Sequence, residues 1–159
     1  MPRTPASRAA PPPSQATLER LRAAEHPRCL LCGPAGGRGL ALAFEVQPDG
    51  AVAAAVAFPG VLEGYPDVLH GGVTAAVLDA AMTNALFSVG VVAVTAELTV
   101  RYVAPVSLAK GAVVRGSVER LGAHTLCLVR AELEQEGAVV ARASARFLAR
   151  RPSGGAAGP

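Results

Sequence analysis

Apolar positions recur along the chain with two different spacings. Residues 40–47, LALAFEVQ, are apolar at alternate positions, and residues 52–59, VAAAVAFP, follow a Pro48-Asp49-Gly50 turn. Alternation on both sides of such a turn predicts a β-hairpin.

The segment that begins at Gly71 and continues to about Val89 has a different pattern. It is rich in alanine and too long for a strand, which predicts a helix. Because this helix is apolar nearly all round, we expect other elements to surround it. A shorter helix is expected to begin after Ser14, whose side chain suits an N-cap, and to end near His26 and Pro27.

Alternation returns after Gly90. Three strand patterns follow in series, at residues 91–106, 111–122 and 124–149. We expect the last pattern to form two strands joined at Glu136 and Gly137, and the short turns favour an antiparallel sheet. Residues 59–69 are punctuated by glycine and proline and predict an irregular loop. The order of elements predicts an α+β fold, in which a curved antiparallel sheet wraps around one long central helix.

Composition sets the extent of the folded part. The 159 residues suit a single domain. Residues 1–16 and 150–159 consist largely of proline, alanine, serine, glycine and arginine, which cannot bury enough apolar surface to offset the entropy of ordering. We therefore expect disordered tails at 1–16 and 150–159 and one folded domain at 17–149.

The charge of the chain is not distributed like that of a nucleic-acid-binding protein. The net charge of +3 arises in the tails, which hold four of the fifteen basic residues and none of the twelve acidic ones. Nucleic-acid modules combine a basic surface with aromatic rings for stacking, and this chain has four Phe, two Tyr and no Trp. We expect no nucleic-acid partner.

Two features of the chain bear on its location. The N-terminus has no apolar segment typical of a secretory signal, so we expect a cytoplasmic location. Residues 73–90 have the length of a membrane span and a single charge. Their polar side chains, together with the strands that follow, favour a buried core helix instead, and we expect no membrane partner.

The sequence HGG, from His70 to Gly72, opens the predicted long helix. The two glycines leave backbone N–H groups accessible at the end where the helix dipole favours negative charge. Asp79 is the one acid of this helix and lies about 12 Å along the axis from Gly71, at about 1.5 Å per residue. One helix cannot bring both groups to a single small atom, whereas a second, antiparallel copy across a two-fold axis would bring one chain's Asp79 towards the other's Gly71.

These motifs resemble those of a known family. HGG with Asp79 nine residues after the histidine, followed by VTAEL at 94–98 and RYVAPV at 101–106, is similar to PaaI-like hotdog-fold acyl-CoA thioesterases of the 4-hydroxybenzoyl-CoA thioesterase superfamily. The resemblance covers about residues 25–149. It implies a hotdog fold, a homodimer or homotetramer, an acyl-CoA substrate bound at the subunit interface, and no cofactor.

The resemblance also implies roles for individual residues. Gly71 would polarise the thioester carbonyl through its N–H, and Asp79 would act as base or nucleophile. Thr95, at the start of the strand after the helix, would orient the water or the acid. His70 would shape the loop and contact the substrate, with Gly72 beside it.

The sequence departs from the family pattern at Gly64. Many relatives carry an asparagine there, six residues before the histidine, so a water-positioning scheme that uses this asparagine does not transfer. Glu63 is the alternative for that role, or else a solvated loop residue. Coenzyme A phosphates need cations near the site, and the candidates that flank the later strands are Arg101, Lys110 and Arg120. Each of these three is otherwise a solvated surface charge.

Simpler structural explanations stay open for the same residues. Asp79 can be a core acid that is satisfied by Thr83 or by a backbone group. His70 can serve only as a helix cap, and the glycines after it can allow close packing. Thr95 can be an ordinary strand residue.

The cysteines offer a separate hypothesis. His26, Cys29 and Cys32 form an HxxCxxC run that suits zinc ligation, and the CxxC pair alone suits redox chemistry. A structural zinc usually has four ligands. The other candidates for a fourth ligand are Cys127, His70 and His124. We favour a structural role for the cysteines, as packed side chains in a turn that Gly33 assists, and expect no metal.

The sequence thus predicts an acyl-CoA thioesterase that frees a carboxylic acid and coenzyme A without a cofactor. Two rivals remain. A hotdog dehydratase or hydratase would use a catalytic histidine with an acid, for which His70 and Asp79 are available. A non-catalytic acyl-CoA-binding module would bind the same thioesters and release no thiol.

Overall fold

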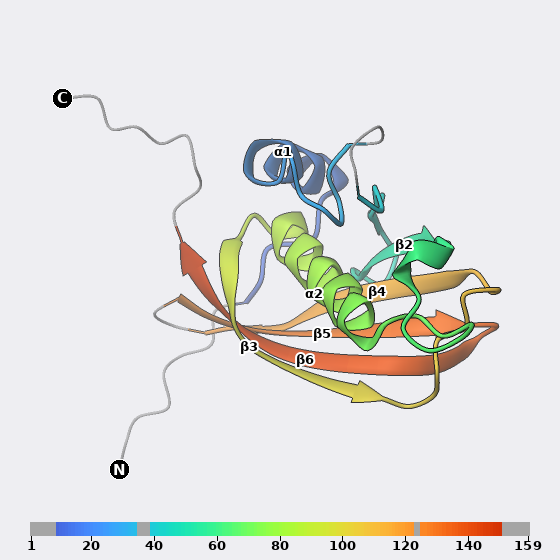
Figure 1. The fold of residues 1–159 in the computed structure, drawn as a ribbon. Coiled ribbons are helices and arrows are strands. Elements are labelled where there is room, and N and C mark those ends of the chain that lie inside the picture. Colours follow the sequence, from blue (N-terminus) through green and yellow to red (C-terminus); the bar gives the residue numbers. More distant parts are fainter. Residues whose placement is uncertain (1–8, 35–38, 123–124, 151–159) are drawn as a thin grey trace, which may run out of the picture.

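The computed structural model describes residues 9–34, 39–122 and 125–150 (Figure 1). The elements follow in this order: α1 (Gln15–Glu25), β1 (Glu45–Val46), β2 (Val52–Val56), the 3-10 helix η1 (Gly60–Leu62), α2 (Gly71–Ser88), β3 (Val92–Tyr102), β4 (Ala112–Leu121), β5 (Leu126–Gln135) and β6 (Ala138–Arg150). The strands form one six-stranded sheet in the order β1-β2-β4-β5-β6-β3, with every neighbouring pair antiparallel. The predicted α+β fold, with a curved antiparallel sheet and a long central helix, is confirmed.

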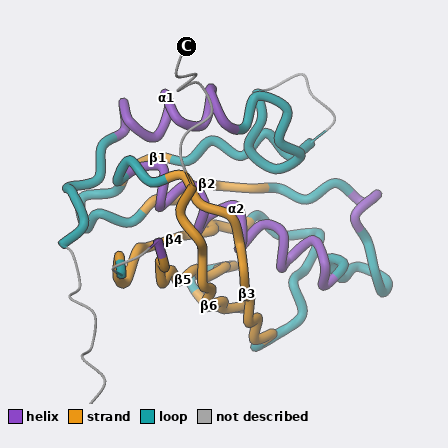
Figure 2. The backbone as a smooth tube through the Cα atoms, turned by 90° about the vertical axis from the view of Figure 1, so that its left-hand side faces the viewer, coloured by secondary structure: helices purple, strands orange, loops and turns teal. Residues whose placement is uncertain are grey.

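Three layers make up the molecule. The helix α2 lies across one face of the curved sheet, and α1 packs on the side of α2 that faces away from the sheet (Figure 1). The same order is visible after a quarter turn, with α1 above α2 and the strands β4, β5 and β6 below it (Figure 2). The position of α2 between two layers explains why its sequence is apolar on most sides.

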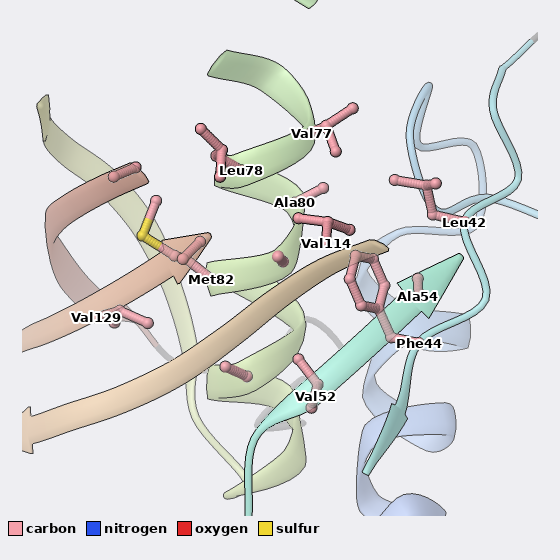
Figure 3. Close-up of a cluster of buried hydrophobic side chains, with 14 of the residues drawn as sticks. Leu42, Phe44, Val52, Ala54, Val77, Leu78, Ala80, Met82, Val114 and Val129 are labelled. Carbon is pink, nitrogen blue, oxygen red and sulfur yellow. The ribbon is translucent and has the colours of Figure 1, made fainter. Parts of the chain in front are cut away.

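The core fills the space between α2 and the sheet. Leu78 and Met82 of the helix, Val114 of β4 and Val129 of β5 are all fully buried, and they lie together in Figure 3. Fully burying one such side chain contributes about 1.5–3 kcal/mol of transfer free energy. The helix and the sheet therefore depend on each other for stability.

Gly116 of β4 lets the sheet approach the helix closely. A Cβ atom at this position would lie 2.4 Å from the carbonyl oxygen of Ala81 in α2. Because this neighbour is backbone, it cannot move aside without shifting the helix. The glycine thus fixes how deeply α2 sits in the curved sheet.

Most of the predicted elements are present, with some differences in length. Ser14 caps α1 as predicted, since its hydroxyl accepts a hydrogen bond from the Thr17 N–H at 3.3 Å. The final two strands meet at Glu136 and Gly137 as predicted, and both residues have positive φ angles, of 51° and 77°. The first hairpin is also confirmed, but β1 is only two residues long, because Ala41 takes a positive φ of 47° that interrupts the extended backbone before it.

The prediction that α2 is surrounded holds only for part of the helix. Residues Ala80–Ser88 are all buried, whereas Gly72, Ala75, Ala76 and Asp79 are partly or fully exposed. These four positions share one face of the helix, at spacings of three and four residues. No element among the described residues covers this face, which we call the open face of α2.

The described elements reach slightly beyond the predicted limits of the folded domain. The helix α1 begins at Gln15 and β6 ends at Arg150, whereas residues 17–149 were the predicted domain. The predictions made for residues 1–8 and 151–159 lie outside the described residues.

None of the described helices combines the length and the apolar character that crossing a membrane requires.

Candidate active site

Asp79 and Thr95 meet at the open face of α2. The Thr95 hydroxyl donates a hydrogen bond to Oδ1 of Asp79 at 2.6 Å. The partner that the sequence suggested for a purely structural acid, Thr83, is buried and makes no such bond in the described structure. The second oxygen of Asp79, Oδ2, has no protein partner among the described residues, so it is free to accept a proton from an exogenous molecule.

A β-bulge in β3 turns Thr95 towards the helix. The pairing of β3 with β6 changes register between Thr95 and Glu97. Without this change, strand alternation would place Thr95 on the face opposite to Leu98. The bulge lets both residues face α2, with Leu98 packed against the core and Thr95 against Asp79. The Asp79–Thr95 contact thus depends on a local irregularity that alternation alone does not predict.

The N-terminus of α2 leaves one backbone amide available. His70 is the N-cap residue, and its Nδ1 accepts a hydrogen bond from the Gly72 N–H at 3.0 Å. The His70 carbonyl oxygen accepts from the N–H groups of Val73 and Thr74. The Gly71 N–H has no acceptor in the described part of the chain, and it lies at the positive end of the helix dipole. This group can therefore donate to an anionic or polarised oxygen.

The two glycines of the HGG motif have different structural roles. A Cβ atom at Gly72 would lie 3.1 Å from the His70 Nδ1, so Gly72 leaves room for the ring that caps the helix. A Cβ atom at Gly71 would make only ordinary contact with Tyr102. The histidine is exposed, and in the described structure its ring acts as the cap that the simpler explanation anticipated.

Tyr102 is a site residue that sequence reasoning missed. Its hydroxyl donates a hydrogen bond to the Gly71 carbonyl oxygen at 2.8 Å, and its ring lies beside the Gly71 Cα position. This contact ties the end of β3 to the start of α2. The signal in the sequence was a tyrosine at the end of a strand pattern, inside the RYVAPV motif. In the structure the large ring of this tyrosine remains 53% exposed.

The loop before α2 is held in place by its own hydrogen bonds. The His70 N–H donates to the Leu62 carbonyl at 2.9 Å, and the Leu69 N–H donates to the Val106 carbonyl at 2.9 Å. Glu63 accepts a hydrogen bond from the Asp67 N–H at 2.7 Å, so it stabilises this loop. These contacts fix the direction in which the HGG motif enters the helix.

The three predicted coenzyme A contacts do not form one cluster. Arg101 lies on β3 and Arg120 on β4, and these strands are separated in the sheet by β5 and β6. Lys110 precedes β4 and forms an ion pair with Glu136 at 2.6 Å, on the surface. A single chain therefore does not gather these cations around Asp79.

The open face of α2 is also not enclosed. Two surface hollows of the described structure, of about 760 and 510 Å³, are both lined by residues other than Asp79, Thr95 and Gly71. The larger one lies near the other end of α2, at Ser88 and Val89. Asp79 thus lies on a surface that another molecule must cover before water can be excluded from it.

The predicted His-Cys-Cys run forms a second polar cluster, between α1 and α2. Burial raises the pKa of the Cys32 thiol to about 11. Burial also lowers the pKa of His26, against the opposite influence of the Glu25 and Asp79 charges. A thiol that stays protonated near neutral pH is a poor nucleophile, so Cys32 is not suited to attack another sulfur. His124, one of the predicted fourth ligands, lies outside the described residues.

Comparison with known proteins agrees with this architecture. Residues 67–141 match the family model of the thioesterase superfamily. This segment contains the HGG motif, Asp79, Thr95 and Tyr102. No curated protein sequence matches the chain.

Several solved structures have a similar fold. A thioesterase superfamily protein is 25% identical, with a TM-score of 0.68, and the alignment covers 73% of this chain but only 60% of that protein. The Escherichia coli PaaI protein from the phenylacetic acid degradation operon is 17% identical, with a TM-score of 0.64 and coverage of 71% and 82%. A hypothetical thioesterase from Streptococcus pneumoniae TIGR4, crystallised with coenzyme A, is 20% identical, with a TM-score of 0.64 and coverage of 70% and 90%.

The Streptococcus protein also has structures of two alanine variants. One replaces an aspartate and the other a threonine sixteen positions later, which is the separation between Asp79 and Thr95 in this chain. The sequence match and the fold agree with each other. Residues 67–141 are similar to the thioesterase superfamily, and the curved sheet and central helix of this chain form the hotdog fold.

Proposed function

We propose that this protein is an acyl-CoA thioesterase that hydrolyses an acyl or aryl-acyl thioester to a carboxylic acid and free coenzyme A. The observation that carries the proposal is the Thr95–Asp79 hydrogen bond, which holds one carboxylate oxygen and leaves the other free on the open face of α2. The coenzyme A bound to the Streptococcus neighbour supports the choice of thioester. A cytoplasmic location is part of the same proposal.

In the proposed reaction, Asp79 acts as a general base. Its Oδ2 accepts a proton from a water molecule whose oxygen attacks the thioester carbonyl carbon. The tetrahedral intermediate then collapses, the carbon–sulfur bond breaks, and the proton held by Asp79 passes to the departing coenzyme A thiolate. If the same oxygen instead attacked the carbonyl directly, a mixed anhydride would form on Asp79, which hydroxylamine would trap.

The Gly71 N–H is the proposed donor to the carbonyl oxygen. A donor aimed at the developing negative charge typically contributes about 10²–10³ in rate. Within one chain the Gly71 and Asp79 positions are about 12 Å apart along the helix, from a rise of about 1.5 Å per residue. The two groups can act on one thioester only if they come from different copies of the chain.

The exposed surfaces around Asp79 support such a dimer. The strand β3 is eleven residues long and lies at the edge of the sheet, next to the open face of α2. A long, unpaired edge strand offers backbone groups to a second copy, and a two-fold axis there would bring two α2 helices together in antiparallel orientation. We infer a homodimer, or a homotetramer built from two such dimers, in which each site contains Asp79 of one chain and Gly71 of the other.

The remaining predicted contacts are part of this proposal. His70 and Gly72 would line the thioester site beside Gly71, because they lie at the same helix end. Arg101, Lys110 and Arg120 would bind the phosphates of coenzyme A from the surface. Lys110 would have to give up its contact with Glu136 to do so.

The experiment measures thiol release from a panel of acyl and aryl-acyl-CoA esters. We expect the unmodified protein to free coenzyme A from at least one of them, and Asp79→Asn to lower the rate about 10²–10⁴-fold. Asp67→Asn is the matched control, because Asp67 is an exposed loop residue whose positive φ of 60° asparagine tolerates well. It should retain the parent rate.

Three results would overturn the proposal. An Asp79→Asn variant as fast as the parent would remove Asp79 from the chemistry. Products that gain water but keep the thioester would identify a hydratase. Tight binding of many acyl-CoA esters without any thiol release would identify a binding module.

A further inference from the structure

A cluster of three metal-binding side chains lies outside the proposed thioester site. His26 follows α1, and Cys29 and Cys32 lie in the turn after it. The three ligand atoms all lie within 4.8 Å of one another, and the His26 Nδ1 is 3.4 Å from the Cys32 Sγ. The proposed hydrolysis makes no use of this cluster.

The turn that carries the cysteines is built so that both sulfurs reach the histidine. The Leu31 N–H donates a hydrogen bond to the Cys29 Sγ at 3.4 Å, and the Gly33 N–H donates to the Cys29 carbonyl at 3.0 Å. A Cβ atom at Gly33 would lie only 2.5 Å from that carbonyl oxygen, so the tight turn requires glycine. An N–H group aimed at a sulfur favours a negatively charged sulfur, as metal thiolates have.

The cluster is close in size to a tetrahedral zinc site, since the His26 Nδ1 and Cys32 Sγ atoms are 3.4 Å apart and all three ligand atoms lie within 4.8 Å of one another. With Zn–S distances of about 2.3 Å and Zn–N distances of about 2.0–2.1 Å, neighbouring ligand atoms lie about 3.5–3.8 Å apart. Two thiolates and one neutral imidazole balance the charge of a divalent cation, which suits a half-buried position. Thiolates also favour zinc over magnesium or calcium.

We propose that His26, Cys29 and Cys32 bind one thiophilic divalent cation, with zinc the best match. The described residues supply three ligands, so the fourth position is left for a water molecule or another exogenous ligand. From the sequence alone, the two cysteines were expected to pack in a turn without a metal. The structure adds that the histidine nitrogen and both sulfurs lie within 4.8 Å of one another.

The polar surroundings of the cluster support a bound ion. Asn84 of α2 is fully buried and lies close to the Cys32 thiol. Its Nδ2 donates to the Ala80 carbonyl, but its Oδ1 has no hydrogen-bond partner among the described residues. A buried amide with an unsatisfied oxygen is costly next to a purely apolar cysteine pair. Beside a metal site, a metal-bound water is a natural donor for such an oxygen.

A metal here would fasten α1 to α2. The His26 ring packs edge-on against Phe87 of α2, with ring centroids 5.0 Å apart, and Cys32 is buried against the same helix. Binding would therefore stabilise the folded state rather than take part in hydrolysis. The inference does not rest on the proposed thioesterase activity.

The test measures metal content and metal-dependent stability of the full chain. We expect the reduced, metal-free protein to take up one Zn²⁺ or one Co²⁺, with a sulfur-to-cobalt charge-transfer absorption in the Co²⁺ form. Free Zn²⁺ at 100 times its dissociation constant should raise the ratio of folded to unfolded protein about 100-fold.

The decisive variant is Cys29→Ser, because Cys29 is only half-buried and its replacement is compatible with folding. It should lose the stoichiometric ion and the charge-transfer absorption. Cys127→Ser is the matched control, since it removes a buried cysteine of β5 that lies outside the cluster, and it should keep both. His26→Gln provides a second test through the nitrogen ligand.

Three outcomes would overturn the proposal. The reduced protein could fail to take up one ion per chain. Cys29→Ser and His26→Gln could bind the ion as tightly as the parent. The purified chain could carry a Cys29–Cys32 disulfide, seen as a loss of two hydrogens in mass, and take up no metal after reduction.

Discussion

The two halves of α2 are parts of one continuous helix, but only the second half is buried on every side. From Ala80 to Ser88 every residue is buried against the sheet or α1, whereas the open face of the first half, at Gly72, Ala75, Ala76 and Asp79, is not covered. Both halves contribute to the core, the first through Thr74, Val77 and Leu78 on its inner side and the second through all of its residues. The open half carries the acid and, at its end, the free amide of Gly71. The proposed chemistry thus lies on the one exposed side of the helix, and substitutions on the open face and in the fully buried half should have different effects.

The largest expected effect is on stability, in the buried half. Leu86→Ala removes a fully buried side chain and should lower the free energy of unfolding by about 2–5 kcal/mol. Ala75→Ser, on the open face, should change it by less than about 0.5 kcal/mol. Urea unfolding at one fixed protein concentration measures both. Equal losses for the two variants would mean that the halves do not differ in the way described.

The next effect is on association, in the open half. Ala76→Glu places a charge on the face that the proposed dimer buries, at a cost of about 3 kcal/mol, or about a 100-fold weaker dimer. Ala23→Glu, on the exposed side of α1, is the control with the same change and should leave association unaltered. Sedimentation over a range of concentrations measures the dissociation constant. A parent protein that is monomeric, or a variant that associates as tightly as the parent, would show that the open face is not the interface.

The smallest expected effect concerns the positioning of the acid. Thr95→Val removes the 2.6 Å hydrogen bond to Asp79 and should lower kcat/KM about 10- to 100-fold, since hydrogen bonds to charged groups contribute about 1.5–3 kcal/mol. Thr95→Ser keeps the hydroxyl and should restore most of the rate, with no change in KM for either variant. Failure of serine to rescue would assign Thr95 a packing role instead.

Local patterns in the sequence predicted the elements well. The helix α2 ends one residue before the predicted limit, and the turn between β5 and β6 is at Glu136 and Gly137 as expected. Both features are set by residues close in the chain: the HGG start, the length of the apolar run, and two positions that must adopt positive φ. Such features need no knowledge of the tertiary structure.

Features that depend on distant parts of the chain were harder to foresee. The bulge next to Thr95 is set by pairing with β6, whose residues come about fifty positions later. The Tyr102 contact with Gly71 spans 31 positions and has no periodic signal. The open face of α2 was missed because composition shows that a helix is apolar but not which side the rest of the chain leaves uncovered. Which side of a helix is covered depends on how the rest of the chain packs around it.

The capping of α2 by His70 also limits which ligands its end can hold. Three of the first four amides of the helix are already engaged by the His70 side chain and carbonyl, so only the Gly71 N–H remains. A phosphate group is bound by several converging N–H groups, whereas a single amide suits a single oxygen atom. The end of α2 is thereby matched to a carbonyl acceptor, and a phosphorylated fragment of a ligand has to be held elsewhere on the protein.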